Sequence, residues 1–115
     1  MGHTQEVGQR AEDRAQARLI AHGLQPVTRN YRCRGGEIDL VMRDGDCLVF
    51  VEVRFRRSNS FGGALSSIDA RKQRRLTLAA QHYLARHGWQ GPCRFDVMAF
   101  DSESRETWIR DAFAT

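Results

Sequence analysis

Hydrophobic positions along the chain change from a helical spacing to a strand spacing and back again. Apolar residues first recur about every four positions, then alternate with polar ones, and later recur at the helical spacing once more. The predicted elements are helices over 4–22 and from Ser67 or Asp69 to His87, strands over 25–31, 37–43, 46–55 and 94–100, and a short terminal element over 107–113. This order predicts an α/β fold in which helices flank a central mixed sheet.

Asp44 and Gly45 join the two central strands, and an Asp-Gly pair between alternating runs is typical of a two-residue hairpin turn. Such a turn predicts three opposed pairs: Arg43 with Asp46, Asp39 with Phe50, and Glu37 with Glu52. One face is then wholly apolar, with Ile38, Leu40, Met42, Val49, Val51 and Val53. The other is apolar near the turn (Val41, Leu48, Phe50) and charged at the open end (Glu37, Asp39, Glu52, Arg54). Both faces are therefore expected to be covered.

Composition is that of one ordinary domain spanning residues 1–115, with 41% hydrophobic and 28% charged residues. No apolar run is long enough to cross a membrane, and the N-terminus lacks an apolar signal segment, so a cytoplasmic protein is expected. The three cysteines are odd in number and widely spaced, which predicts reduced, packed thiols.

The net charge of +4 favours an acidic partner, with nucleic acid first. Seventeen of the 18 basic residues are arginine, which codon bias in a GC-rich genome explains equally well. Cations crowd the first turns of the second helix, where they oppose the helix dipole unless a phosphate lies nearby. A solvated basic face is the alternative. The predicted nucleic-acid contacts are Arg56, Arg71, Lys72 and Arg75.

Glu37, Asp39 and Glu52 are expected within about 5–8 Å of one another at the open end of the hairpin. Carboxylates that close repel each other and need a compensating cation. Hard oxygen ligands suit Mg²⁺ or Mn²⁺, and Arg54 lies on the same face, where it can pair with a phosphate oxygen. The alternative is an ordinary pair of surface strands whose acids pair with arginines.

The ordered motifs resemble the YraN-like family of small bacterial proteins. That family is similar to the PD-(D/E)xK, or restriction-endonuclease-like, nucleases and to Holliday-junction resolvases in particular. The resemblance covers nearly the whole chain. Its motifs are Gly8 with Glu12, Arg29-Asn30-Tyr31-Arg32, Gly36-Glu37-Ile38-Asp39-Leu40, Val49-Phe50-Val51-Glu52-Val53-Arg54, Lys72 with Arg75-Leu76, and Arg94-Phe95-Asp96-Val97.

The resemblance implies a restriction-endonuclease-like fold and a role for each matching residue. Asp39 and Glu52 would bind the metal, the Val53 carbonyl and Glu12 would add ligands, and Glu37 would be an auxiliary acid. Arg54 stands where the superfamily usually has lysine. Arginine stays charged and cannot act as a base, although it can still stabilise a phosphate. Arg56 and Lys72 are candidate substitutes for that lysine.

These features predict a metal-dependent endonuclease that acts on DNA, including branched DNA. One alternative is a nucleic-acid-binding module that keeps the fold without the chemistry. Another is a protein-interaction adaptor that uses the terminal aromatics Trp108 and Phe113 as a contact patch, which would also allow a homodimer. Packing of these two rings onto the core is the simpler expectation.

Overall fold

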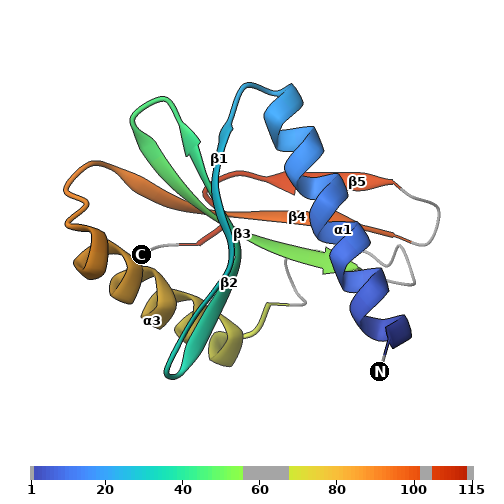
Figure 1. The fold of residues 1–115 in the computed structure, drawn as a ribbon, viewed down its shortest axis with the longest axis horizontal. Helices are drawn as coiled ribbons and strands as arrows, with labels where there is room; N and C mark the ends of the chain where they lie inside the picture. Colours follow the sequence, from blue (N-terminus) through green and yellow to red (C-terminus); the bar gives the residue numbers. More distant parts are fainter. Residues whose placement is uncertain (1, 56–67, 102–104, 114–115) are drawn as a thin grey trace.

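The chain folds into one mixed five-stranded sheet with a helix on each face (Figure 1). A computed structural model describes residues 2–55, 68–101 and 105–113, with side chains described from residue 8 onward. The elements are α1 (Gly2–Ala21), β1 (Gln25–Cys33), β2 (Gly36–Asp44), β3 (Cys47–Phe55), α3 (Ala70–His87), β4 (Cys93–Phe100) and β5 (Glu106–Ile109). Strand order is β1-β2-β3-β4-β5, with β3 and β4 parallel and the other neighbours antiparallel. The predicted α/β class and order of elements are confirmed, and the terminal addition forms β5.

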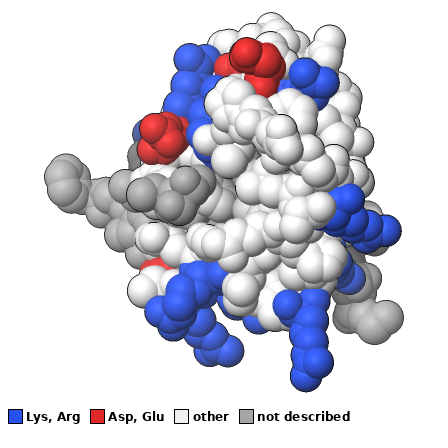
Figure 2. Space-filling view, turned by 90° about the vertical axis from the view of Figure 1, so that its left-hand side faces the viewer, with Lys and Arg blue, Asp and Glu red and all other residues white. Residues whose placement is uncertain are grey.

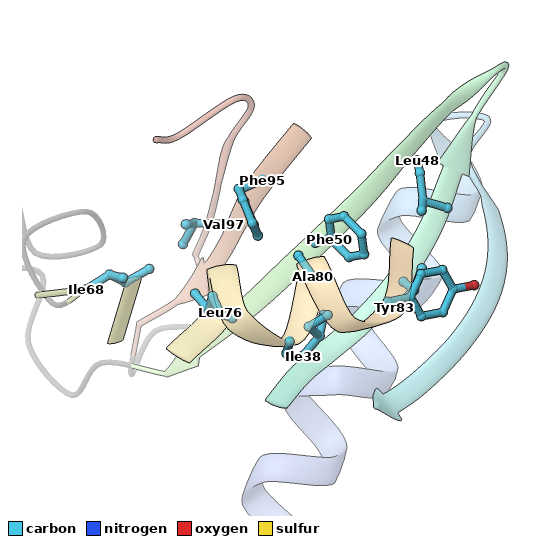
Figure 3. Close-up of a cluster of buried hydrophobic side chains, with 11 residues drawn as sticks. Ile38, Leu48, Phe50, Ile68, Leu76, Ala80, Tyr83, Phe95 and Val97 are labelled. Carbon is cyan, nitrogen blue, oxygen red and sulfur yellow. The ribbon is translucent and has the colours of Figure 1, made fainter. Parts of the chain in front are cut away.

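Each face of the sheet carries its own hydrophobic core, as the alternating strands predicted. The core beneath α1 includes Ala15, Leu19, Leu40, Met42, Val49 and Val51. The core beneath α3 includes Leu76, Tyr83, Val41, Phe50 and Phe95 (Figure 3). Trp108 packs against the first core and Phe113 against the second. The three cysteines are free thiols packed at the edges of these cores, as predicted.

The pairing of β2 with β3 differs by two residues from the predicted register. Asp44 lies opposite Cys47 and Arg43 opposite Leu48, so the turn residues are Gly45 and Asp46. Gly45 has a positive φ of 62° at the first turn position, which is typical of a type II′ hairpin. A shift of two residues keeps the side chains on their predicted faces. It corrects the pairs, however, because Phe50 now faces Val41 and not Asp39.

One predicted face assignment is wrong. Ile38 packs in the core beneath α3, whereas Leu40, two residues later, packs beneath α1. Alternating positions normally share a face, so β2 changes orientation at Asp39. Its partner β1 is distorted at the same level, because Asn30 adopts a positive φ of 53° between paired neighbours. Asparagine tolerates this conformation better than most residues. The apolar pattern of the sequence did not predict that β2 changes faces at Asp39.

Both helices end at glycines, as their spacing predicted. Asp69 caps the start of α3 by accepting the backbone N–H of Lys72 at 2.8 Å, and Gly88 closes its end with a positive φ of 62°. Gly23 follows α1 with a φ of 97°. Among the described residues, neither helix is long and apolar enough to cross a membrane.

Gly36 allows α3 to lie directly on the start of β2. A β-carbon at this position would stand 2.1 Å from the carbonyl oxygen of Arg75, a contact that no side chain can make. The helix backbone therefore reaches the sheet only because residue 36 is glycine. This close contact brings the first turns of α3 beside the open end of the hairpin.

Candidate active site

Asp39 on β2 and Glu52 on β3 form the centre of the candidate site. The regular pairing of β2 with β3 ends at Leu40 opposite Val51, one residue before each acid. Asp39 and Glu52 nevertheless interact directly, because, in addition to burial, the charge of Glu52 and a side-chain hydrogen bond to it both raise the pKa of Asp39. The backbone N–H of Val53 donates to Asp39 Oδ2 at 2.9 Å. The Asp39 carboxylate is thereby held in place by β3 itself, and the sequence prediction that the two acids meet is supported by this geometry.

Two cations of different origin contact the Glu52 carboxylate, which is only 3% exposed. Arg54 Nη1 lies 3.4 Å from Glu52 Oε2, and Lys72 Nζ lies 3.3 Å from the same oxygen. Arg54 follows Glu52 on the strand, whereas Lys72 arrives from α3. Lys72 is the single lysine among the 115 residues. Lys72, one of the two residues predicted to substitute for the lysine that the nuclease superfamily has at position 54, therefore lies beside Glu52.

The pKa of Asp39 is raised to about 7 from its ordinary value of 3.8. Burial is the main cause, and the nearby charge of Glu52 adds to it. The hydrogen bond from Val53 and the positive charge of Lys72 act in the opposite direction. Near neutral pH Asp39 is therefore protonated in a large fraction of the molecules.

Replacement of Asp39 with asparagine is expected to stabilise the fold more at pH 8 than at pH 5, by about 2 kcal/mol. Since the folded-state pKa of about 7 exceeds the unfolded value of 3.8, the native wild-type protein loses stability as pH rises between these values. Asparagine removes this loss and can still accept the Val53 N–H. Urea unfolding at both pH values measures the effect.

Asp46→Asn, an exposed change in the hairpin turn, is the control for the Asp39→Asn comparison. It is expected to shift the unfolding free energy equally at both pH values. The same pH-independent shift for Asp39→Asn would contradict the raised pKa.

The other predicted acids lie elsewhere. Glu12 forms an ion pair with Arg29 at 3.3 Å, and Glu37 pairs with Arg32 at the same distance. Within residues 2–55, 68–101 and 105–113, no group of three or more His, Cys, Asp or Glu side chains could hold a metal ion. The structure therefore unites Asp39 and Glu52, next to Val53, but does not add Glu12 or Glu37 to them. Sequence spacing did not reveal Arg29 as the partner of Glu12.

A basic pocket of about 250 Å³ adjoins the acidic pair. Its lining residues are Arg54, Asp69, Arg71, Lys72 and Arg75. Three of the four predicted nucleic-acid contacts, Arg71, Lys72 and Arg75, thus share one hollow, while Arg56 lies outside the described residues. Basic side chains also gather along the lower edge of the face in Figure 2. The pocket is well suited to an anion.

Fold and site together define a small α/β protein with an acidic pair, Asp39 half-buried and Glu52 buried, at the open end of a β-hairpin and next to a basic pocket. The chain belongs to Uncharacterised protein family UPF0102, which matches residues 11–100 and confirms the YraN-like resemblance. It is 59% identical over 111 residues to a UPF0102 protein of Cupriavidus pinatubonensis, covering 96% of this chain and 87% of that protein. A UPF0102 protein of Janthinobacterium is 55% identical over 108 residues, covering 94% of this chain and 87% of its own length.

Proposed function

We propose that this protein is a metal-dependent nuclease of the restriction-endonuclease-like fold that hydrolyses DNA phosphodiester bonds, including those of branched DNA. The observation that carries the proposal is the meeting of Asp39, Glu52 and Lys72, in which one lysine from α3 contacts the buried member of an acidic pair. A carboxylate with a raised pKa, such as that of Asp39 beside the buried Glu52, is characteristic of functional sites.

The chemistry of the donor set fits Mg²⁺ or Mn²⁺. Asp39 and Glu52 would hold the ion through hard carboxylate oxygens, and they repel each other without one. Two protein carboxylates suffice for Mg²⁺, which keeps several waters and takes further oxygens from substrate phosphate. When bound, such an ion lowers the pKa of water and polarises a phosphoryl oxygen.

Arg54 and Lys72 supply two different functions to this chemistry. The Arg54 guanidinium stays charged at all relevant pH values and can stabilise the developing charge on the phosphate. The Lys72 ammonium group can donate three hydrogen bonds, so it can orient the attacking water beside the acidic pair. Position 54, where the nuclease superfamily usually has lysine, is arginine in this chain. A lysine from the neighbouring helix takes over the role of that lysine.

Wild-type protein is expected to cleave supercoiled and four-way-junction DNA with Mn²⁺ or Mg²⁺, and Asp39→Ala is expected to abolish cleavage. Loss of Asp39 removes one of the two metal-binding carboxylates. Gel assays of both substrates measure the activity, with Asp46→Ala in the exposed turn as the control. Equal cleavage by wild type and Asp39→Ala would exclude this site.

A second candidate function is nucleic-acid binding without catalysis. It is favoured by the two cations that occupy Glu52 Oε2 and by arginine at position 54. This candidate predicts salt-sensitive DNA binding, no metal-dependent turnover and no gain from Arg54→Lys. Titration calorimetry with Mn²⁺ on wild type and Glu52→Ala separates the two, because only the nuclease requires a metal site. Undetectable DNA binding at low salt would instead favour the protein-interaction adaptor.

A further inference from the structure

The basic pocket suits an anion, whereas the acidic pair suits a cation. We propose that the pocket binds the terminal phosphate monoester of a nucleic-acid strand, which places the strand end beside Asp39 and Glu52. This proposal rests on the proposed nuclease function for its choice of a nucleic acid. The pocket itself is defined by residues on two elements, Arg54 from the end of β3 and the others from the start of α3.

Charge matching favours a dianion in this pocket. Its lining holds four cations, Arg54, Arg71, Lys72 and Arg75, and a single carboxylate, Asp69, while Glu52 beside it contacts only Arg54 and Lys72, so the pocket keeps an excess of positive charge. A phosphate monoester carries a charge of about −1.5 to −2 at pH 7. A phosphodiester within a strand carries a single negative charge, so it matches the excess less well.

The excess charge resides on Arg71 and Arg75. Glu52 already pairs with both Arg54 and Lys72. Among the described residues, neither Arg71 nor Arg75 forms an ion pair with a carboxylate. These two arginines lie four residues apart, on one face of α3, so both side chains can converge on one group. Arginine donates paired N–H bonds that fit phosphate oxygens.

Recognition in this pocket depends on side chains and not on the helix terminus. The carboxylate of Asp69 already accepts the backbone N–H of Lys72 at 2.8 Å. Arg74 provides a useful contrast, because it is exposed on the same helix but lines a separate hollow with Thr77 and Leu78. A general attraction of DNA to the basic helix would involve Arg74 as much as Arg75.

Binding of single strands labelled at an internal base, measured by fluorescence anisotropy with EDTA, tests this proposal without requiring cleavage. Strands with a 5′-phosphate, a 3′-phosphate or only hydroxyl ends are compared, with inorganic phosphate and a nucleoside monophosphate as competitors. One phosphorylated end is expected to tighten binding roughly ten-fold. Arg75→Gln and Arg71→Gln should each remove this preference, whereas Arg74→Gln should keep it.

Asp39→Ala is expected to retain the phosphate preference while losing cleavage, so the two proposals can fail separately. Equal affinity for phosphorylated and hydroxyl-ended strands would overturn the pocket assignment even if the protein cleaves DNA. Equal effects of Arg74→Gln and Arg75→Gln would also overturn it. A nucleoside monophosphate that binds as tightly as the phosphorylated strand would overturn the choice of a strand end.

Discussion

Replacement of Lys72 with methionine is expected to lower metal-dependent DNA cleavage roughly 100-fold or more while the fold is retained. The Lys72 Nζ atom lies 3.3 Å from Glu52 Oε2, and its side chain is 29% exposed, so its loss affects the site more than the core. Methionine preserves the length and apolar stem of lysine but removes the charge and the N–H donors. Initial rates of plasmid cleavage at saturating Mn²⁺ measure the effect, and circular dichroism checks the fold.

Lys72→Arg separates the charge of this residue from the geometry of its ammonium group. Arginine keeps the ion pair with Glu52, but its planar guanidinium presents its N–H groups in a fixed fork. Lys72→Arg is therefore expected to bind DNA like the wild type and to cleave it slowly. Adding Arg54→Lys to this variant should restore part of the activity, because it returns a lysine to the same carboxylate. Unchanged rates for Lys72→Met would remove Lys72 from the mechanism.

The sole lysine in an arginine-rich chain gives this prediction additional weight. Codon bias explains arginine at a position where either cation serves. It does not explain the lysine that contacts Glu52, in a sequence with 17 arginines. The sequence alone could name Lys72 as a candidate. Its distance from Glu52 depends on the packing of α3 against Gly36, which is a tertiary contact without a periodic signal.

The alternation of apolar residues was sufficient to predict the hairpin and its two covered faces, but not its pairing. Whether Gly45 takes the first or the second turn position changes the register by two residues, and the sequence Asp44-Gly45-Asp46 suits both options. A shift of two residues leaves each side chain on the same face of the sheet. Asp39 and Glu52 were therefore correctly expected on the same face. The reversal of Ile38 could not be predicted, because no break in the apolar alternation marks it; in the structure it coincides with a left-handed Asn30 in the neighbouring strand.

The role of Asp96 was not predicted at all, although this residue belongs to one of the sequence motifs. Its buried carboxylate accepts hydrogen bonds from Arg94 Nε at 2.9 Å, from Trp108 Nε1 at 3.0 Å and from the backbone N–H of Asp111 at 3.0 Å. It therefore ties β4 to β5 and to the turn that follows. Sequence patterns predict strands and helices well, but a polar network between distant residues has no periodicity to detect.

Asp96→Ala is expected to destabilise the protein by about 3–5 kcal/mol, because it leaves a largely buried guanidinium without its main partner. Asp96 is 0% exposed, and the Arg94 side chain is 18% exposed. Burial lowers the pKa of Arg94, but hydrogen bonds and charge from Asp96 outweigh this and raise it. Asp44 also contacts Arg94, at 3.1 Å, yet its side chain is 46% exposed, so Asp44→Ala should cost at most about 1 kcal/mol. Urea unfolding followed by tryptophan fluorescence compares the two variants, and equal midpoints would show that Asp96 does not hold the end of the sheet together.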